Sequence, residues 1–117
     1  MEELSLKDLS PYQKRLDIIE KTAAQVQKDF QLFNLNISFS GNPETAYNEL
    51  FQEVHRHIQQ LWNSNQSSLW SILYQIDLDE EKALKTLHLQ DEPTEKLTDM
   101  ILQRELKKVI IREFYKK

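Results

Sequence analysis

Hydrophobic residues recur along most of the chain at steps of three and four, the spacing that places them on one face of an α-helix. The first such stretch follows Ser10 and Pro11, a helix-capping residue and a residue suited to the first helical position, and it predicts a helix over residues 11–33. An Asn-Pro pair precedes the second stretch and predicts a helix over residues 43–63. The apolar stripe of the first helix consists of Tyr12, Leu16, Ile19, Ala23, Val26, Phe30 and Phe33.

Three further helices are predicted in the second half of the chain. Ser68 begins a helix over residues 68–76, and Asp79, followed by two glutamates, begins another over residues 79–88. The last helix is predicted over residues 93–115. Its apolar residues lie nearly all round, so it is either the central helix of a bundle or a helix shared with a second copy of the chain.

One short stretch has a different period. Leu35, Ile37 and Phe39 alternate with polar residues, as in a half-buried strand. A single strand has no partner for its backbone, so we expect an extended segment at about residues 35–39 that crosses the bundle. The alternative is a short ribbon, formed with residues 87–89 or with a second subunit.

Composition supports helices with short connections. The chain has 117 residues with one Gly and three Pro, whereas a sheet of this size needs more glycine in its turns. The sequence therefore predicts an all-α, compact bundle of four to five helices. We expect a single helical domain over residues 1–117 with a flexible N-terminus at about residues 1–9.

Several features of the sequence argue against particular classes of protein. The chain has no Cys, which excludes disulfides and thiol catalysis. The acidic N-terminus lacks the apolar core of a secretory signal, and no apolar run approaches the roughly 20 residues that span a bilayer. These features predict a cytoplasmic location without contact to a membrane.

Charge is distributed unevenly. The net charge of −4 argues against a general nucleic-acid coat protein. Residues 77–95 carry seven acidic side chains against two basic ones, a net of −5, whereas residues 104–117 carry six basic against two acidic, a net of +4. Arg104, Lys108, Arg112 and Lys116 would form one row on a helix and repel one another. Their partner is either the acidic segment of the same chain, an acidic protein, or nucleic-acid phosphate.

Candidate catalytic and metal-binding residues are few. His55 and His57 would point about 200° apart on a helix and cannot bind one ion together. Glu49, Glu53 and His57 stack on one edge and could face a divalent metal, but they lack the Glu-x-x-His spacing of carboxylate-bridged bundles. We interpret them as a solvated edge. The sequence also has no nucleophile elbow and no phosphate-binding loop, so we predict no enzyme activity, no cofactor and no metal.

The remaining hypothesis is a small, non-catalytic interaction module that binds itself, as a possible homodimer, or another protein. The alternative is a nucleic-acid-associated accessory protein that uses the basic C-terminal helix. The predicted interaction residues come from that helix and from the two tryptophans: Arg104, Lys108, Arg112, Tyr115, Trp62 and Trp70.

Overall fold

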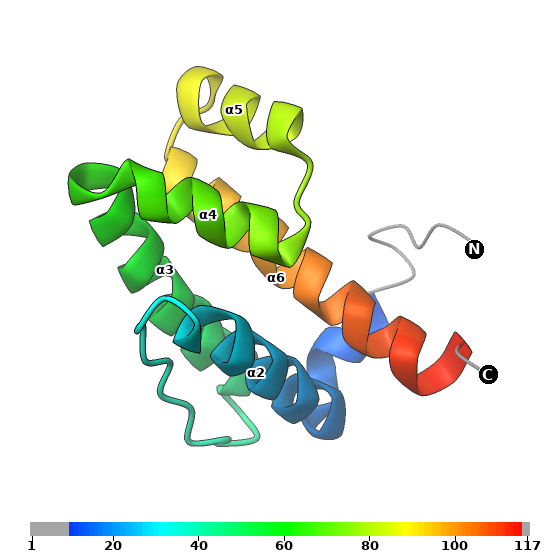
Figure 1. The fold of residues 1–117 in the computed structure, drawn as a ribbon. Helices are drawn as coiled ribbons and strands as arrows, with labels where there is room; N and C mark the ends of the chain where they lie inside the picture. Colours follow the sequence, from blue (N-terminus) through cyan, green and yellow to red (C-terminus); the bar gives the residue numbers. More distant parts are fainter. Residues whose placement is uncertain (1–9, 116–117) are drawn as a thin grey trace.

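The computed structural model describes residues 10–115, and every regular element within them is a helix (Figure 1). The elements in order are a 3-10 turn η1 (Ser10–Lys14), helices α2 (Leu16–Gln31), α3 (Ala46–Ser64), α4 (Gln66–Ile76), α5 (Glu80–Leu89) and α6 (Pro93–Ile110), and a π turn η2 (Ile111–Tyr115). This arrangement confirms the predicted all-α bundle. The predicted flexible stretch at about residues 1–9 lies outside the described residues.

Helix α6 occupies the middle of the bundle. It contacts α2, α3, α4 and α5, and Figure 1 shows it running diagonally behind α4. Its apolar side chains on all sides are almost completely shielded from solvent by this one chain: Leu97, Ile101, Leu102, Leu106, Val109 and Ile110. Of the two alternatives for the apolar last helix, the structure shows the central one.

The predicted start of the first helix is wrong by about five residues. Arg15 has an extended backbone (φ −92°, ψ 114°) that separates η1 from α2. Its guanidinium binds the Asp17 carboxylate at 2.9 Å and lies over the rings of Tyr12 and Phe114, at 5.8 and 5.5 Å from their centroids. These contacts favour the break that the apolar pattern did not reveal.

Two helix caps also differ from the prediction, and one agrees. Asn65 rather than Ser68 caps α4, because the Ser68 amide donates to the Asn65 side chain at 3.2 Å. Helix α3 begins after Thr45 and not directly at the Asn-Pro pair. Asp79 caps α5 as predicted, accepting from the Lys82 amide at 3.1 Å.

Residues 35–39 cross the bundle in extended form, and no strand occurs anywhere in residues 10–115. Ile37 is buried, and the flanking Leu35 and Phe39 pack on the core. Side chains of α3 supply the hydrogen bonds that a neighbouring strand would otherwise give. Glu49 accepts from the Ser40 amide at 2.6 Å, Glu53 accepts from the Ser38 amide at 3.2 Å, and the His57 ring bonds the Asn36 carbonyl at 2.8 Å.

The row of Glu49, Glu53 and His57 is therefore not the solvated edge that we predicted. Its three side chains, four residues apart on α3, hold the extended segment at successive points. His57 is buried, at 6% exposure, because this segment covers it. The helical spacing was visible in the sequence, but the segment that packs across it was not.

We expect Glu49→Gln to loosen residues 36–42. The Ser40 amide, with the Ser40 hydroxyl and the Gly41 amide, lowers the pKa of Glu49, so these donors favour the ionised carboxylate. A neutral amide accepts these bonds less strongly. Hydrogen exchange measured by mass spectrometry should become faster in this segment. For the same reason, the protection factors of this segment in the parent chain, corrected for the intrinsic pH dependence of amide exchange, should decrease as the pH falls through the lowered pKa.

The exposed Glu44, in the same region, offers a matched control. Glu44→Gln removes an equal charge, but the structure gives its carboxylate no such donors, so protection of residues 36–42 should not change. Equal protection in the Glu49 variant and in the parent would contradict this role.

Candidate functional site

The predicted basic row lies along α6 and η2 and faces the rest of the same chain. The Arg104 guanidinium donates to the Asp77 carboxylate at the end of α4, at 3.2 Å. Arg112 donates to the side-chain oxygen of Gln25 on α2, at 3.0 Å. Side chains of the same chain thus bind Arg104 and Arg112, the first and last residues of the row within residues 10–115.

The middle of the row contains a buried pair of acidic side chains. Glu105 on α6 is fully buried, and Asp29 on α2 is 3% exposed. The Lys108 ammonium lies 3.1 Å from a Glu105 oxygen and 3.7 Å from an Asp29 oxygen. The Gln25 amide donates to both Asp29 oxygens, at 3.3 and 3.2 Å. One cation, the Lys108 ammonium, therefore faces two carboxyl groups where α2 and α6 pack together.

Burial raises the pKa of Glu105 to about 8, and the hydrogen bond and negative charge of Asp29 add to the effect. Lys108 opposes this rise without cancelling it. At neutral pH Glu105 therefore holds a proton and donates it toward Asp29.

The two predicted tryptophans lie at different places. Trp62 on α3 packs edge-on against the His88 ring of α5, with centroids 5.8 Å apart. Trp70 lies on α4 and lines a surface groove to which Trp62 does not contribute. The structure therefore does not bring the two indoles into one pocket.

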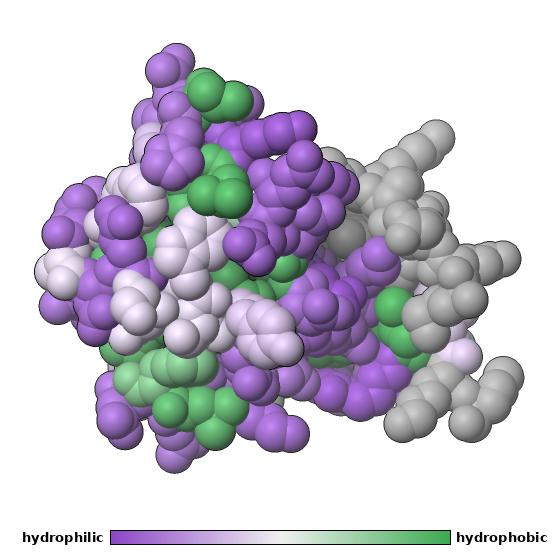
Figure 2. Space-filling model, turned by 45° about the horizontal axis from the view of Figure 1, so that its top comes forward, coloured by the Kyte–Doolittle hydropathy of each residue, from purple (hydrophilic) through white to green (hydrophobic). Residues whose placement is uncertain are grey.

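The groove has an aromatic lining. Its volume is about 520 Å³. We call it the α4 groove, and its apolar lining consists of Phe33, Trp70, Leu73, Tyr74 and Leu78. Figure 2 shows pale and green residues gathered over this part of the surface, between purple areas.

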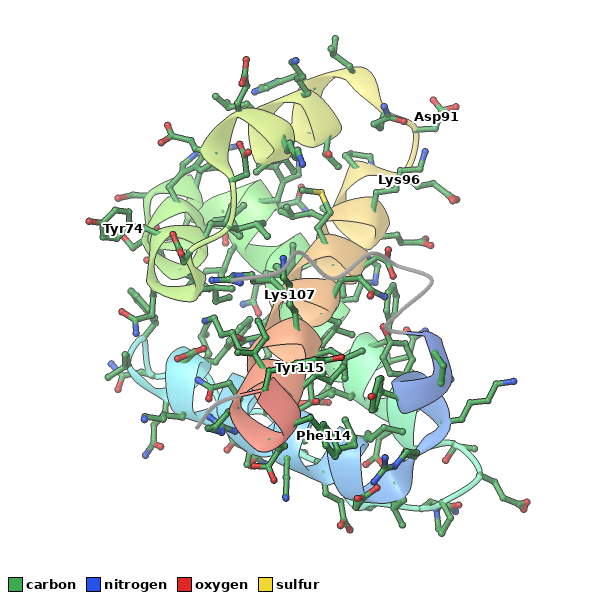
Figure 3. All side chains as sticks on the ribbon, turned by 90° about the vertical axis from the view of Figure 1, so that its right-hand side faces the viewer. Tyr74, Asp91, Lys96, Lys107, Phe114 and Tyr115 are labelled. Carbon is green, nitrogen blue, oxygen red and sulfur yellow. The ribbon has the colours of Figure 1, made fainter. Side chains whose placement is uncertain are left out.

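Tyr74 is the most exposed large apolar side chain of the described residues, at 88%. Figure 3 shows it projecting from the edge of the molecule into solvent. Trp70 and Tyr74 lie four residues apart on α4, and Leu78 lines the same groove just beyond the end of the helix, so the three side chains form one apolar ridge. Trp70 was among the predicted interaction residues, but Tyr74 was not.

Tyr115, the last predicted interaction residue, lies elsewhere. It is 51% exposed on η2, next to Phe114 at 46%. Phe114 packs on Tyr12 with ring centroids 5.6 Å apart. Figure 3 shows Phe114 and Tyr115 together, well separated from Tyr74.

The histidines hold the fold together. The His55 ring bonds the Thr94 hydroxyl at 3.0 Å and so links α3 to the start of α6. His57 bonds the crossing segment, and His88 packs against Trp62. Within residues 10–115 no three His, Asp or Glu side chains are grouped so that they could hold a metal ion.

None of the helices in residues 10–115 has the length and apolar character needed to cross a membrane. Comparison with protein-family models, with curated proteins and with solved structures found no match. The function is therefore inferred from the chemistry of the surface.

Proposed function

We propose that this protein is a non-catalytic interaction module that binds another protein through the α4 groove. The observation that carries the proposal is the exposure of Tyr74, at 88%, beside the partly buried Trp70 and Leu78. Aromatic side chains on a concave surface are typical binding hot spots, because they bury much apolar area with little loss of side-chain freedom. Tyr74, unlike Trp70 and Leu78, is not packed against the core, so core packing does not explain its position.

The groove supports binding better than the basic row does. Arg104 and Lys108 are engaged with Asp77 and with the buried acids, and their side chains are only 28% and 23% exposed. An external partner would have to displace these contacts. Trp70 is thus the one residue of the sequence-based set that belongs to the proposed surface.

The same contacts weaken the support for the nucleic-acid alternative. Phosphate binding requires cations that are free to replace the counterions of the nucleic acid. Arg112 is the most exposed cation of the described row, at 48%, and it already bonds Gln25 and lies 3.9 Å from Glu113. Among the described residues, the hollow that Arg112 lines has no aromatic side chain in its lining.

Experiments at Tyr74 and Tyr115 should show whether the α4 groove or the C-terminal turn is the binding surface. A photo-crosslinking amino acid at position 74 should capture a protein from the native cytosol that the same amino acid at position 115 does not. The captured protein is then purified, and its affinity is measured by titration calorimetry. Tyr74→Ser should weaken binding at least about tenfold, the loss expected for an aromatic hot spot.

Tyr115→Ser is the matched control, because it removes the same side chain from another exposed position. Both variants should keep the parental stability to within about 0.5 kcal/mol. Equal affinity of the parent and Tyr74→Ser would overturn the proposal. A loss of affinity in Tyr115→Ser alone would mean that the partner binds at the C-terminal turn.

A further inference from the structure

The α4 groove ends against a group of acidic side chains. Glu80 lines the groove itself. Asp77, Asp79 and Glu81 are exposed beside it, and no base occurs from residue 77 to residue 81. The apolar ridge of α4 thus leads directly into the most acidic part of the chain.

This acidity is only partly neutralised by the protein. Arg104 reaches Asp77 at 3.2 Å, but the Asp77 side chain remains 85% exposed. Among residues 10–115 no cation lies within ion-pair distance of Glu80. The rim therefore retains negative charge that an incoming group can approach.

The apolar lining and the acidic rim together define the occupant. We propose that the α4 groove binds a segment of another protein in which apolar side chains are followed by Lys or Arg. The apolar side chains would cover Trp70, Tyr74 and Leu78, and the cationic ones would reach Asp77 and Glu80. This inference rests on the proposed function and adds the chemistry of the partner to it.

The shape of the groove agrees with a short segment. A volume of about 520 Å³ falls in the range of roughly 300–1,000 Å³ that is usual for ligand pockets, which accommodates a few side chains. The helical part of the ridge, from Trp70 to the end of α4 at Ile76, is about 9 Å long at 1.5 Å per residue. Addition of a strand to a sheet edge does not apply, since residues 10–115 contain no strand.

Two labelled model peptides test the charge preference. Each carries leucines and one tryptophan in its first half; the first peptide continues with lysines, and the second has glutamates at the same positions. Fluorescence anisotropy at low salt should show the lysine peptide binding roughly three- to tenfold more tightly, because two partly exposed ion pairs contribute about 0.2–1 kcal/mol each. The preference should shrink as salt is added.

Matched charge variants identify the acids responsible. Asp77→Asn with Glu80→Gln should remove the preference, and asparagine suits the left-handed backbone of Asp77 (φ 66°). Glu92→Gln with Glu95→Gln removes the same charge and should preserve the preference. Lys96, the neighbour of Glu95, lies on the opposite side of the molecule from Tyr74 (Figure 3).

The outcomes distinguish this inference from the proposed function. Equal binding of both peptides, lost in Tyr74→Ser, would overturn the charge preference and leave the groove as the binding surface. A lysine preference that Tyr74→Ser does not weaken would show non-specific attraction and overturn the inference. Absence of binding would also overturn it, and crosslinking at position 74 would still decide the proposed function. Sedimentation showing a dimer that Tyr74→Ser dissociates would make a second copy the occupant and likewise overturn it.

Discussion

Glu105→Gln should stabilise the protein by roughly 3 kcal/mol at pH 8 and change its stability little at pH 5. The pKa of the buried Glu105 rises from its ordinary value of 4.5 to about 8. Between these values the folded chain holds a proton that the unfolded chain has lost, so the stability of the parent falls by about 1.4 kcal/mol per pH unit as the pH rises. Glutamine has nearly the same shape and does not titrate. Its amide can donate to Asp29 and its oxygen can face Lys108.

The measurement is urea denaturation of both proteins in steps from pH 5 to pH 8. The difference between the two free energies of unfolding isolates Glu105 and the two groups in contact with it, Asp29 and Lys108, because distant titrating groups contribute equally to both proteins. Glu113→Gln provides the control, since Glu113 forms a surface ion pair with Lys21 and its loss should matter by about 1 kcal/mol or less. A parent whose stability does not fall relative to the Gln variant over this range would contradict the protonated state of Glu105.

Two sets of carboxyl groups thus respond to pH in opposite directions. Glu49 and Glu53 have lowered pKa values, although burial partly opposes the effect of the donors on Glu53, so their contribution is lost as the pH falls. Glu105 has a raised pKa, so its contribution is lost as the pH rises. Loosening in acid should therefore begin at the crossing segment, whereas loosening in base should begin at the seam between α2 and α6.

The local periodicity of the sequence was sufficient to predict the helices. Ile19, Ala23, Val26 and Phe30 were assigned to one stripe and are all buried. Such a stripe depends on neighbours three and four residues away, which the chain itself specifies. The break at Arg15 was missed because it depends on the rings of Tyr12 and Phe114, and Phe114 is 99 positions away in the chain (114 − 15).

The partners of the basic row were only partly predictable. The acidic segment after residue 77 was one expected partner, and Asp77 does bind Arg104. Asp29, which faces Lys108, was not considered, although it adjoins Phe30 at the edge of the apolar stripe. Periodicity shows which residues share a face, but it does not show which helix packs against that face.

The α4 groove could not be derived from the sequence for the same reason. Periodicity places Trp70 and Tyr74 beside the buried face of their helix, where filling of the core is the more usual role of aromatic side chains. Phe33, which follows α2, and Leu78, in the α4–α5 connection, complete the groove around them. An exposed aromatic ridge becomes informative only when the rest of the chain is placed around it.

Leu102→Ala should lower the free energy of unfolding by about 3 kcal/mol, and the loss should not depend on protein concentration. Leu102 is fully buried in the main core, where removal of three carbons leaves a cavity that the neighbouring helices cannot fill. Tyr115→Ala, in the exposed turn that follows the same helix, should change stability by about 1 kcal/mol or less.

Concentration distinguishes a central helix from one that is shared between two copies. A helix that requires a second copy to cover its apolar residues would unfold at a denaturant midpoint that rises with protein concentration. Because this chain alone buries Leu97, Leu102 and Leu106 of α6, the midpoints of the parent and of Leu102→Ala should stay constant over a hundredfold range of concentration. Midpoints that rise with concentration, or a small effect of Leu102→Ala, would mean that α6 is an interface helix and that the predicted homodimer uses it.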